Sequence, residues 1–171
     1  MKKRLMEKML SLLSIAIVFA CIIPTANVSA IYIPDYVQSL YRSGIVTVAT
    51  NQLDKPYVFG SRGPSSFDCS GLAWYAYSQC GYSIKKWSAA SQAEDMANTY
   101  REVTSLKNGY LIFYDYTKTP NGQYLDIDHV SIYIGNSYMI DASSSNGKVV
   151  KRSSTIMQND IVMKARPATY L

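Results

Sequence analysis

Helical spacing of apolar side chains dominates the first half of the chain. From Asp35 to Asn51 these side chains recur every three or four positions, which predicts a helix with one apolar face. A mostly apolar segment from Asp68 to Gln79 follows a loop rich in glycine, proline and serine, and it stops at Gly81, which predicts a second helix. A third helix is predicted over residues 88–99, with Ser88 as a candidate N-cap.

The second half of the chain changes to short runs of aromatic and β-branched residues, which are typical of strands. The predicted strands are Tyr110–Tyr114, His129–Ile134, Ser137–Ala142, Lys148–Arg152 and Ile161–Ala165. Gly135-Asn136 and Asn146-Gly147 are signals for hairpin turns. Helices followed by an antiparallel meander predict an α+β fold, with the helices packed on one face of a sheet of about five or six strands.

The first thirty residues have the pattern of an export signal. Four basic side chains among the first eight residues precede an apolar run that begins at Met9, and Val28-Ser29-Ala30 supplies small residues for cleavage. We therefore expect residues 1–30 to be a secretory signal peptide and residues 31–171 to form one secreted domain. The apolar run is short for a bilayer span, so membrane contact is expected only during export. Cys21 is an alternative site of lipid attachment.

Charge and ligand content narrow the functional classes. Residues 1–30 hold four of the 17 Lys/Arg and one of the 12 Asp/Glu, so 13 basic and 11 acidic side chains remain, a net charge of +2 rather than +5. The remainder has no basic cluster larger than two residues, which argues against nucleic acid as a partner. With one histidine and no paired ligand motif, no metal is expected. We expect no other cofactor, and a monomer.

All fifteen tyrosines follow residue 30, an unusual concentration for a chain of this length. One explanation is that they occupy half-buried positions from which the hydroxyl reaches water. The alternative is that some of them line a groove for a peptide or a sugar. The sequence leaves both explanations open.

Two cysteines follow residue 30, one near the start of the second predicted helix and the other directly after its end. Eleven helical residues separate Cys69 from Cys80 by about 16 Å, whereas a disulfide needs Cα atoms within about 7 Å, so an intrachain bridge is excluded. Cys69 opens the helix, where the helix dipole and backbone N–H groups favour a thiolate and a developing oxyanion. Ser65-Ser66 offers capping oxygens. A small cysteine buried in the core is the alternative interpretation.

His129, the only histidine, stands at the start of a predicted strand. It is the one candidate for proton transfer by a ring nitrogen near neutral pH, and it would have to reach the sulfur of Cys69. A third group should accept a hydrogen bond from the other ring nitrogen. Asp141, on the strand across the predicted first hairpin turn, is the leading candidate, and Asp126 and Asp128 compete with it. A histidine at the rim of a sheet without a catalytic role is the alternative.

These residues belong to a pattern that resembles the NlpC-type cell-wall peptidase family. The resemblance runs from about residue 44 to about residue 166, and five sequence blocks occur in the family's order. The blocks are Lys55–Gly60, Gly63–Gly71, Asn108–Phe113, His129–Gly135 and Met139–Ser143. One block alone would be weak evidence, whereas five in order are specific.

The resemblance implies a papain-like α+β fold and hydrolysis of peptide bonds in bacterial peptidoglycan, commonly the bond from γ-D-glutamyl to the diamino acid. It implies that Cys69 is the nucleophile, that His129 is the base and that Asp141 is the third polar residue. It also implies a second, substrate-binding group near the sulfur and near the N-terminal side of the substrate. That group consists of Tyr57, Asp68, Ser70 and Ser88.

The chain departs from the family pattern at several positions. Asp141 stands where histidine is commoner, and because a carboxylate raises the basicity of the imidazole, we expect activity to survive. Tyr110 replaces the usual acidic residue and Ser131 the usual glycine, which affects local packing. Residues 115–128 form a long polar insertion before the base. We hypothesise that this insertion walls off one end of the cleft and restricts which stem peptides enter.

Two alternatives to a cysteine endopeptidase stay open. One is a wall amidase of the same Cys–His class, which would cut between the sugar and the peptide. The other is a non-catalytic wall-binding protein that retains the fold. The bond that is cut, and the effect of removing the Cys69 sulfur, distinguish the three possibilities.

Overall fold

The computed structural model describes residues 35–85, 87–99 and 101–167. The predicted signal peptide and Cys21 lie outside the described residues. Within these ranges, no helix is both long enough and apolar enough to cross a membrane.

Three helices form where the spacing of apolar residues predicts them. They are α2 (Asp35–Thr50), α3 (Cys69–Gln79) and α4 (Ala89–Asn98). The side chain of Ser88 caps α4 as predicted and accepts a hydrogen bond from the Ser91 N–H at 3.2 Å. The prediction that Ser65 or Ser66 caps α3 is wrong, because the N-cap is Asp68. The Ser66 hydroxyl instead contacts that of Ser61 at 2.7 Å.

Five strands form one antiparallel sheet, which confirms the predicted fold class. The strands are β1 (Leu111–Tyr114), β2 (His129–Gly135), β3 (Tyr138–Ser143), β4 (Lys148–Ser153) and β5 (Ile161–Ala165). Their order is β4-β3-β2-β1-β5. The first four strands make the predicted meander, but β5 does not extend it, since it returns to pair with β1 at the opposite edge.

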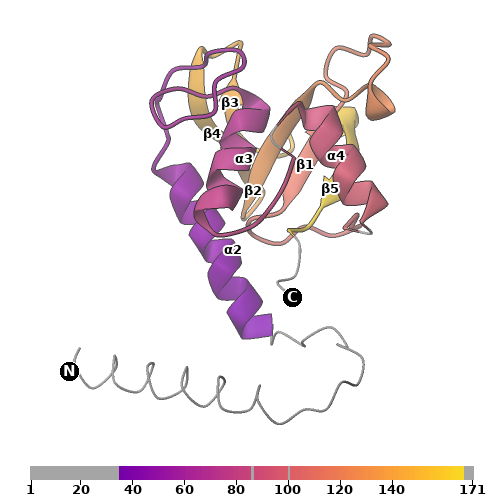
Figure 1. Ribbon diagram of the computed structural model, residues 1–171. Coiled ribbons are helices and arrows are strands. Elements are labelled where there is room, and N and C mark those ends of the chain that lie inside the picture. Colours follow the sequence, from indigo (N-terminus) through magenta and orange to yellow (C-terminus); the bar gives the residue numbers. More distant parts are fainter. Residues whose placement is uncertain (1–34, 86, 100, 168–171) are drawn as a thin grey trace, which may run out of the picture. The chain divides into compact units, whose positions relative to one another are not determined.

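The helices form a layer on one face of the sheet (Figure 1). Helix α3 lies over β2 and β3, α4 lies over β1, β2 and β5, and α2 packs on α3. The main core fills the space between these layers, and its fully buried members include Leu72 and Ala76 of α3 and Phe113, Val130 and Ile132 of the sheet. Burial of this apolar surface holds α3, and therefore its first residue, in a fixed position over the sheet.

A smaller apolar cluster covers the other face of the sheet. Ile112, Tyr114 and Met139 are fully buried there, and Met157 packs on them from the segment between β4 and β5. The Tyr114 hydroxyl lies 2.9 Å from that of Ser131 and donates to the Met139 sulfur at 3.1 Å. Ser131, which departs from the family's usual glycine, thus supplies a partner for a buried tyrosine.

Candidate active site

Cys69 is the first residue of α3, and Asp68 fixes the backbone on both sides of it. One oxygen of Asp68 accepts hydrogen bonds from the Gly71 N–H at 2.6 Å and from the Ser70 hydroxyl at 3.0 Å. Its other oxygen accepts from the Gly60 N–H at 2.8 Å. Asp68 is 8% exposed, so these bonds form away from bulk water. The carboxylate therefore locks the loop before the helix to the first turn of the helix.

His129 is the first residue of β2, and the strand register places its side chain on the same face as that of Asp141. Ile132 pairs with Ile140 across the β2–β3 hairpin, so His129 and Asp141 are diagonal neighbours on the face away from the helices. The ring Nε2 of His129 lies 2.8 Å from Oδ2 of Asp141. With Asp141 ionised, Nε2 is the donor.

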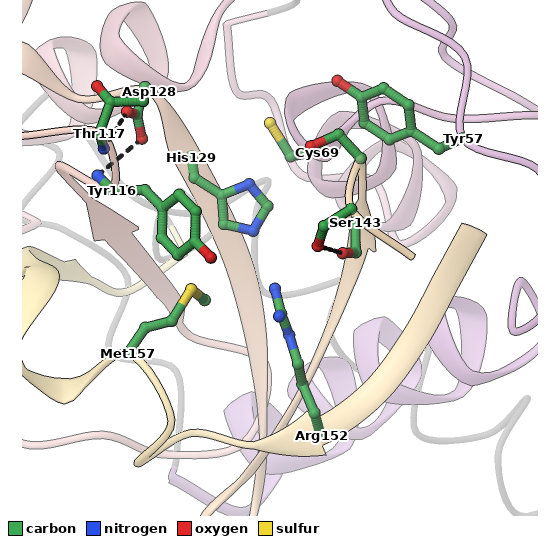
Figure 2. Close-up of a pocket in the computed structure, with 11 residues that line it drawn as sticks. Tyr57, Cys69, Tyr116, Thr117, Asp128, His129, Ser143, Arg152 and Met157 are labelled. Carbon is green, nitrogen blue, oxygen red and sulfur yellow. Dashed lines mark hydrogen bonds between the residues drawn. The ribbon is translucent and has the colours of Figure 1, made fainter. Parts of the chain in front are cut away.

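The sulfur of Cys69 and the ring of His129 come together at the end of the sheet (Figure 2). Burial by itself lowers the pKa of His129, but hydrogen bonds with Asp141 and Cys69 and their negative charges outweigh it and raise the pKa to about 10. The imidazole is therefore protonated at neutral pH. Its side chain is 15% exposed, which leaves a way in for a reactant.

Asp141 is fully buried and has two cationic neighbours. Besides His129, Arg152 of β4 contacts both carboxylate oxygens, through Nε at 2.9 Å and through Nη2 at 2.5 Å. Burial raises the pKa of Asp141, but contact with His129 and with Arg152 overcomes this effect and lowers it. The carboxylate is thus ionised and held in one orientation by a bidentate guanidinium.

The competing carboxylates Asp126 and Asp128 are occupied elsewhere. Asp128 accepts from the backbone N–H groups of Tyr116 and Thr117 at 2.9 and 2.8 Å (Figure 2). Asp126 accepts from the N–H groups of Asn121 and Gly122 at 2.9 and 3.2 Å. Both carboxylates organise the insertion that precedes β2, and neither contacts the His129 ring.

Two pockets open beside Cys69, and Cys69, Tyr57 and Asp128 line both. Residues of the histidine-side pocket include His129, Tyr116, Ser143, Arg152 and Met157. Residues of the tryptophan-side pocket include Tyr57, Phe59, Arg62, Asp68, Ser70, Trp87 and Ser88. All four predicted substrate-binding residues thus lie around one pocket beside the sulfur. Whether they contact a substrate stays a prediction.

The insertion at residues 115–128 borders both pockets. Tyr116 and Thr117 line the histidine-side pocket, Gln123 and Ile127 line the tryptophan-side pocket, and Asp128 lines both. The insertion therefore runs along the cleft. The hypothesis that it closes one end of the cleft and restricts which stem peptides enter stays a prediction.

Arg152 is the member of the site that sequence reasoning missed. Met139 pairs with Arg152 across the β3–β4 hairpin, so Arg152 is a diagonal neighbour of Asp141 on the same face. The signal was present, since both strands and the Asn146-Gly147 turn were predicted and a buried carboxylate needs a cationic partner. The sequence analysis counted Arg152 only among the scattered basic residues and assigned it no partner.

Comparison with known proteins places this fold and site in a family. A model of the NlpC/P60 family matches residues 54–166, more than half of the chain. The chain therefore belongs to the NlpC/P60 family. The match includes both pockets and all five strands, so the predicted resemblance is confirmed.

The curated relatives that match this chain include endopeptidases, one of them named as a peptidoglycan endopeptidase. Probable endopeptidase p60 of Listeria grayi is 38% identical over 103 residues, 60% of this chain and 18% of that protein. Peptidoglycan endopeptidase RipB of Mycobacterium tuberculosis is 36% identical over 120 residues, 61% of this chain and 44% of that protein. The solved structure of the peptidoglycan hydrolase RipB matches with a TM-score of 0.64 at 27% identity, over 87% of this chain and 75% of that chain. The alignment thus spans less than half of either curated relative.

Proposed function

We propose that this chain is an exported cysteine endopeptidase that hydrolyses stem peptides of bacterial peptidoglycan. The observation on which this proposal depends is that Cys69, at a helix start, lines the same pocket as the His129 imidazole, whose Nε2 is bound to a buried carboxylate. The name of the relative RipB, a peptidoglycan endopeptidase and hydrolase, supports peptidoglycan as the substrate. The bond from γ-D-glutamyl to the diamino acid is the proposed point of cleavage.

In the proposed reaction the Cys69 thiolate attacks the peptide carbonyl, and backbone N–H groups at the start of α3 stabilise the oxyanion. Protonated His129 gives its proton to the leaving amine, which departs and leaves an acyl-enzyme. Water then attacks the acyl-enzyme with His129 as the base, and the thiolate is released. Asp141 holds the ring in position throughout.

The position of the proton donor sets the direction in which the substrate lies. His129 lines the pocket that also contains Arg152 and not the pocket that contains Trp87, whereas Cys69 lines both. Because the leaving amine must be next to His129, the C-terminal half of the substrate occupies the histidine-side pocket. The acyl half occupies the tryptophan-side pocket. Tyr57, like Cys69, lines both pockets. Burial and the nearby Cys69 and Asp68 raise the pKa of Tyr57, so its hydroxyl stays a donor for the substrate.

Digestion of purified cell wall tests this proposal directly. New free amino termini at the diamino acid support the endopeptidase, and liberated L-alanine termini support the amidase instead. Cys69→Ala should abolish wall solubilisation while the far-ultraviolet circular dichroism stays unchanged. An unchanged biological effect of that variant would favour a wall-binding protein. Mass mapping of the secreted product tests cleavage after residue 30 and lipid attachment at Cys21.

A further inference from the structure

Two large aromatic side chains are exposed at the tryptophan-side pocket. Phe59 is 89% exposed and Trp87 is 65% exposed, and both line this pocket. They come from different parts of the chain, one from the loop before α3 and the other from the segment before α4. Exposed aromatic residues that line the same cleft indicate a binding surface, because their burial by a ligand is favourable.

Arg62 contacts the indole of Trp87. Its guanidinium lies over the indole ring, 5.2 Å from the centroid. A cation over one face of the ring favours this orientation of the indole, while most of the side chain stays exposed. Trp87 therefore presents exposed aromatic surface on which a ligand can stack.

The direction in which the substrate lies identifies the part of it that reaches Phe59 and Trp87. The acyl half of the substrate lies in the tryptophan-side pocket, so moving from Cys69 towards Trp87 follows the peptide towards its N-terminus. In peptidoglycan the N-terminal amine of the stem peptide is linked to the lactyl group of a sugar. Hexopyranose rings have apolar C–H faces that stack on aromatic side chains. This stacking contact needs no charged side chain of the protein.

We propose that Phe59 and Trp87 form a stacking site for the pyranose ring attached to the N-terminus of the stem peptide. This site selects peptide that is still joined to the glycan over peptide that has been released from it. The inference rests on the proposed function, because that function supplies the substrate direction. It adds a ligand class, a sugar, and two specificity-determining residues that do not touch the reacting atoms.

The test compares two substrates that differ only in the sugar. One is a muramyl tripeptide and the other is the same tripeptide with an acetylated N-terminus, which removes any difference in charge. Phe59→Ala/Trp87→Ala should lower kcat/KM for the muramyl tripeptide by about tenfold or more. The kcat/KM for the acetylated tripeptide should change by less than about twofold. Equal losses on both substrates, or no loss on the muramyl tripeptide, would overturn the inference.

A matched control is available at the other end of the β2–β3 hairpin. Tyr138 is 45% exposed and has Lys151 over its ring at 4.7 Å, so it is also an exposed aromatic side chain beneath a cation. It does not line either pocket. Tyr138→Ala should leave the ratio of kcat/KM values for the two substrates unchanged.

A binding measurement separates this inference from the proposed function. Calorimetry with Cys69→Ala should give tighter binding of the muramyl tripeptide than of the acetylated tripeptide, and adding Trp87→Ala should remove the difference. If that difference is found but the wild-type protein cleaves neither compound, the endopeptidase proposal fails and the sugar site stands. If the two compounds bind equally, or neither binds, the sugar site is refuted.

Discussion

Replacing Arg152 with methionine removes the cation behind Asp141 and keeps most of the aliphatic stem. Arg152 supplies two of the three side-chain hydrogen bonds that reach this carboxylate, and its own side chain is only 19% exposed. It does not need to touch the substrate to matter. It positions Asp141, which in turn positions the ring of His129.

The size of the effect follows from the burial of the pair. Removing one partner of a buried ion pair costs about 3–5 kcal/mol. His129 remains as a partner for Asp141, so the lower end, about 3 kcal/mol, is expected. For a domain of this size that loss lowers Tm by roughly 10 °C. Loss of the fixed ring orientation should lower kcat/KM by about tenfold to a hundredfold.

The pH dependence of kcat/KM distinguishes a positioning role of Arg152 from a purely structural one. Arg152 lowers the pKa of Asp141 in the folded protein, so its contribution to stability is present above the unfolded pKa and is lost as the pH falls through the folded pKa. Without the guanidinium the pKa of Asp141 rises. The acid limb of the kcat/KM profile should therefore move to higher pH in Arg152→Met. Arg152→Lys retains the charge and should restore part of the shift.

Arg101 provides the matched control for this experiment. Its side chain is 9% exposed and donates to Asp95 at 2.9 Å, and it does not line either pocket. Arg101→Met should lower stability in urea by a similar amount and leave the pH profile in place. If the two variants lose activity equally and neither acid limb moves, Arg152 is only structural and the positioning role is refuted.

Three further outcomes are expected. NMR titration of the single histidine should give a midpoint near 10 for His129 and a lower midpoint in Asp141→Asn. The protonated ring also stabilises the fold, and this contribution is full below about pH 6.5. It should be lost as the pH rises through about 10. Ser131→Ala should cost about 1 kcal/mol in urea unfolding, because the buried Tyr114 hydroxyl loses its hydroxyl partner; an unchanged midpoint would contradict this. Burial raises the pKa of Cys80, so iodoacetamide should modify it more slowly at pH 8 than it modifies an unfolded peptide with the same residue.

The elements of the fold were predictable because their signals are local. Helices α2, α3 and α4 and all five strands begin and end within one or two residues of their predicted bounds. The side of the sheet on which β5 lies was not predictable, because its pairing with β1 joins strands far apart in the chain. The cap of α3 was missed because Asp68 was assigned to the substrate, although it also binds the Gly71 N–H.

The candidate site was predictable in its first two residues and ambiguous in its third. One histidine and one cysteine at a helix start left no competing choices for that pair. The choice among three carboxylates depended on the β2–β3 register, and the register shifts between Tyr133 and Gly135. Asn136 and Ser137 both have positive φ in the turn, a conformation that the residue types alone do not fix.

Opposite charges alternate through the site, and this explains why an aspartate serves at the third position. The order is the Cys69 sulfur, the His129 ring with its raised pKa, the Asp141 carboxylate and the Arg152 guanidinium, so the four groups together carry no net charge in the thiolate–imidazolium form that the proposed reaction uses. A buried carboxylate without Arg152 would leave an uncompensated negative charge once the ring gives up its proton. A neutral histidine at position 141 would have no need of the guanidinium and would leave it unpaired. The residues at 141 and 152 are therefore expected to be coupled, so that Asp141→His should be tolerated better together with Arg152→Met than alone.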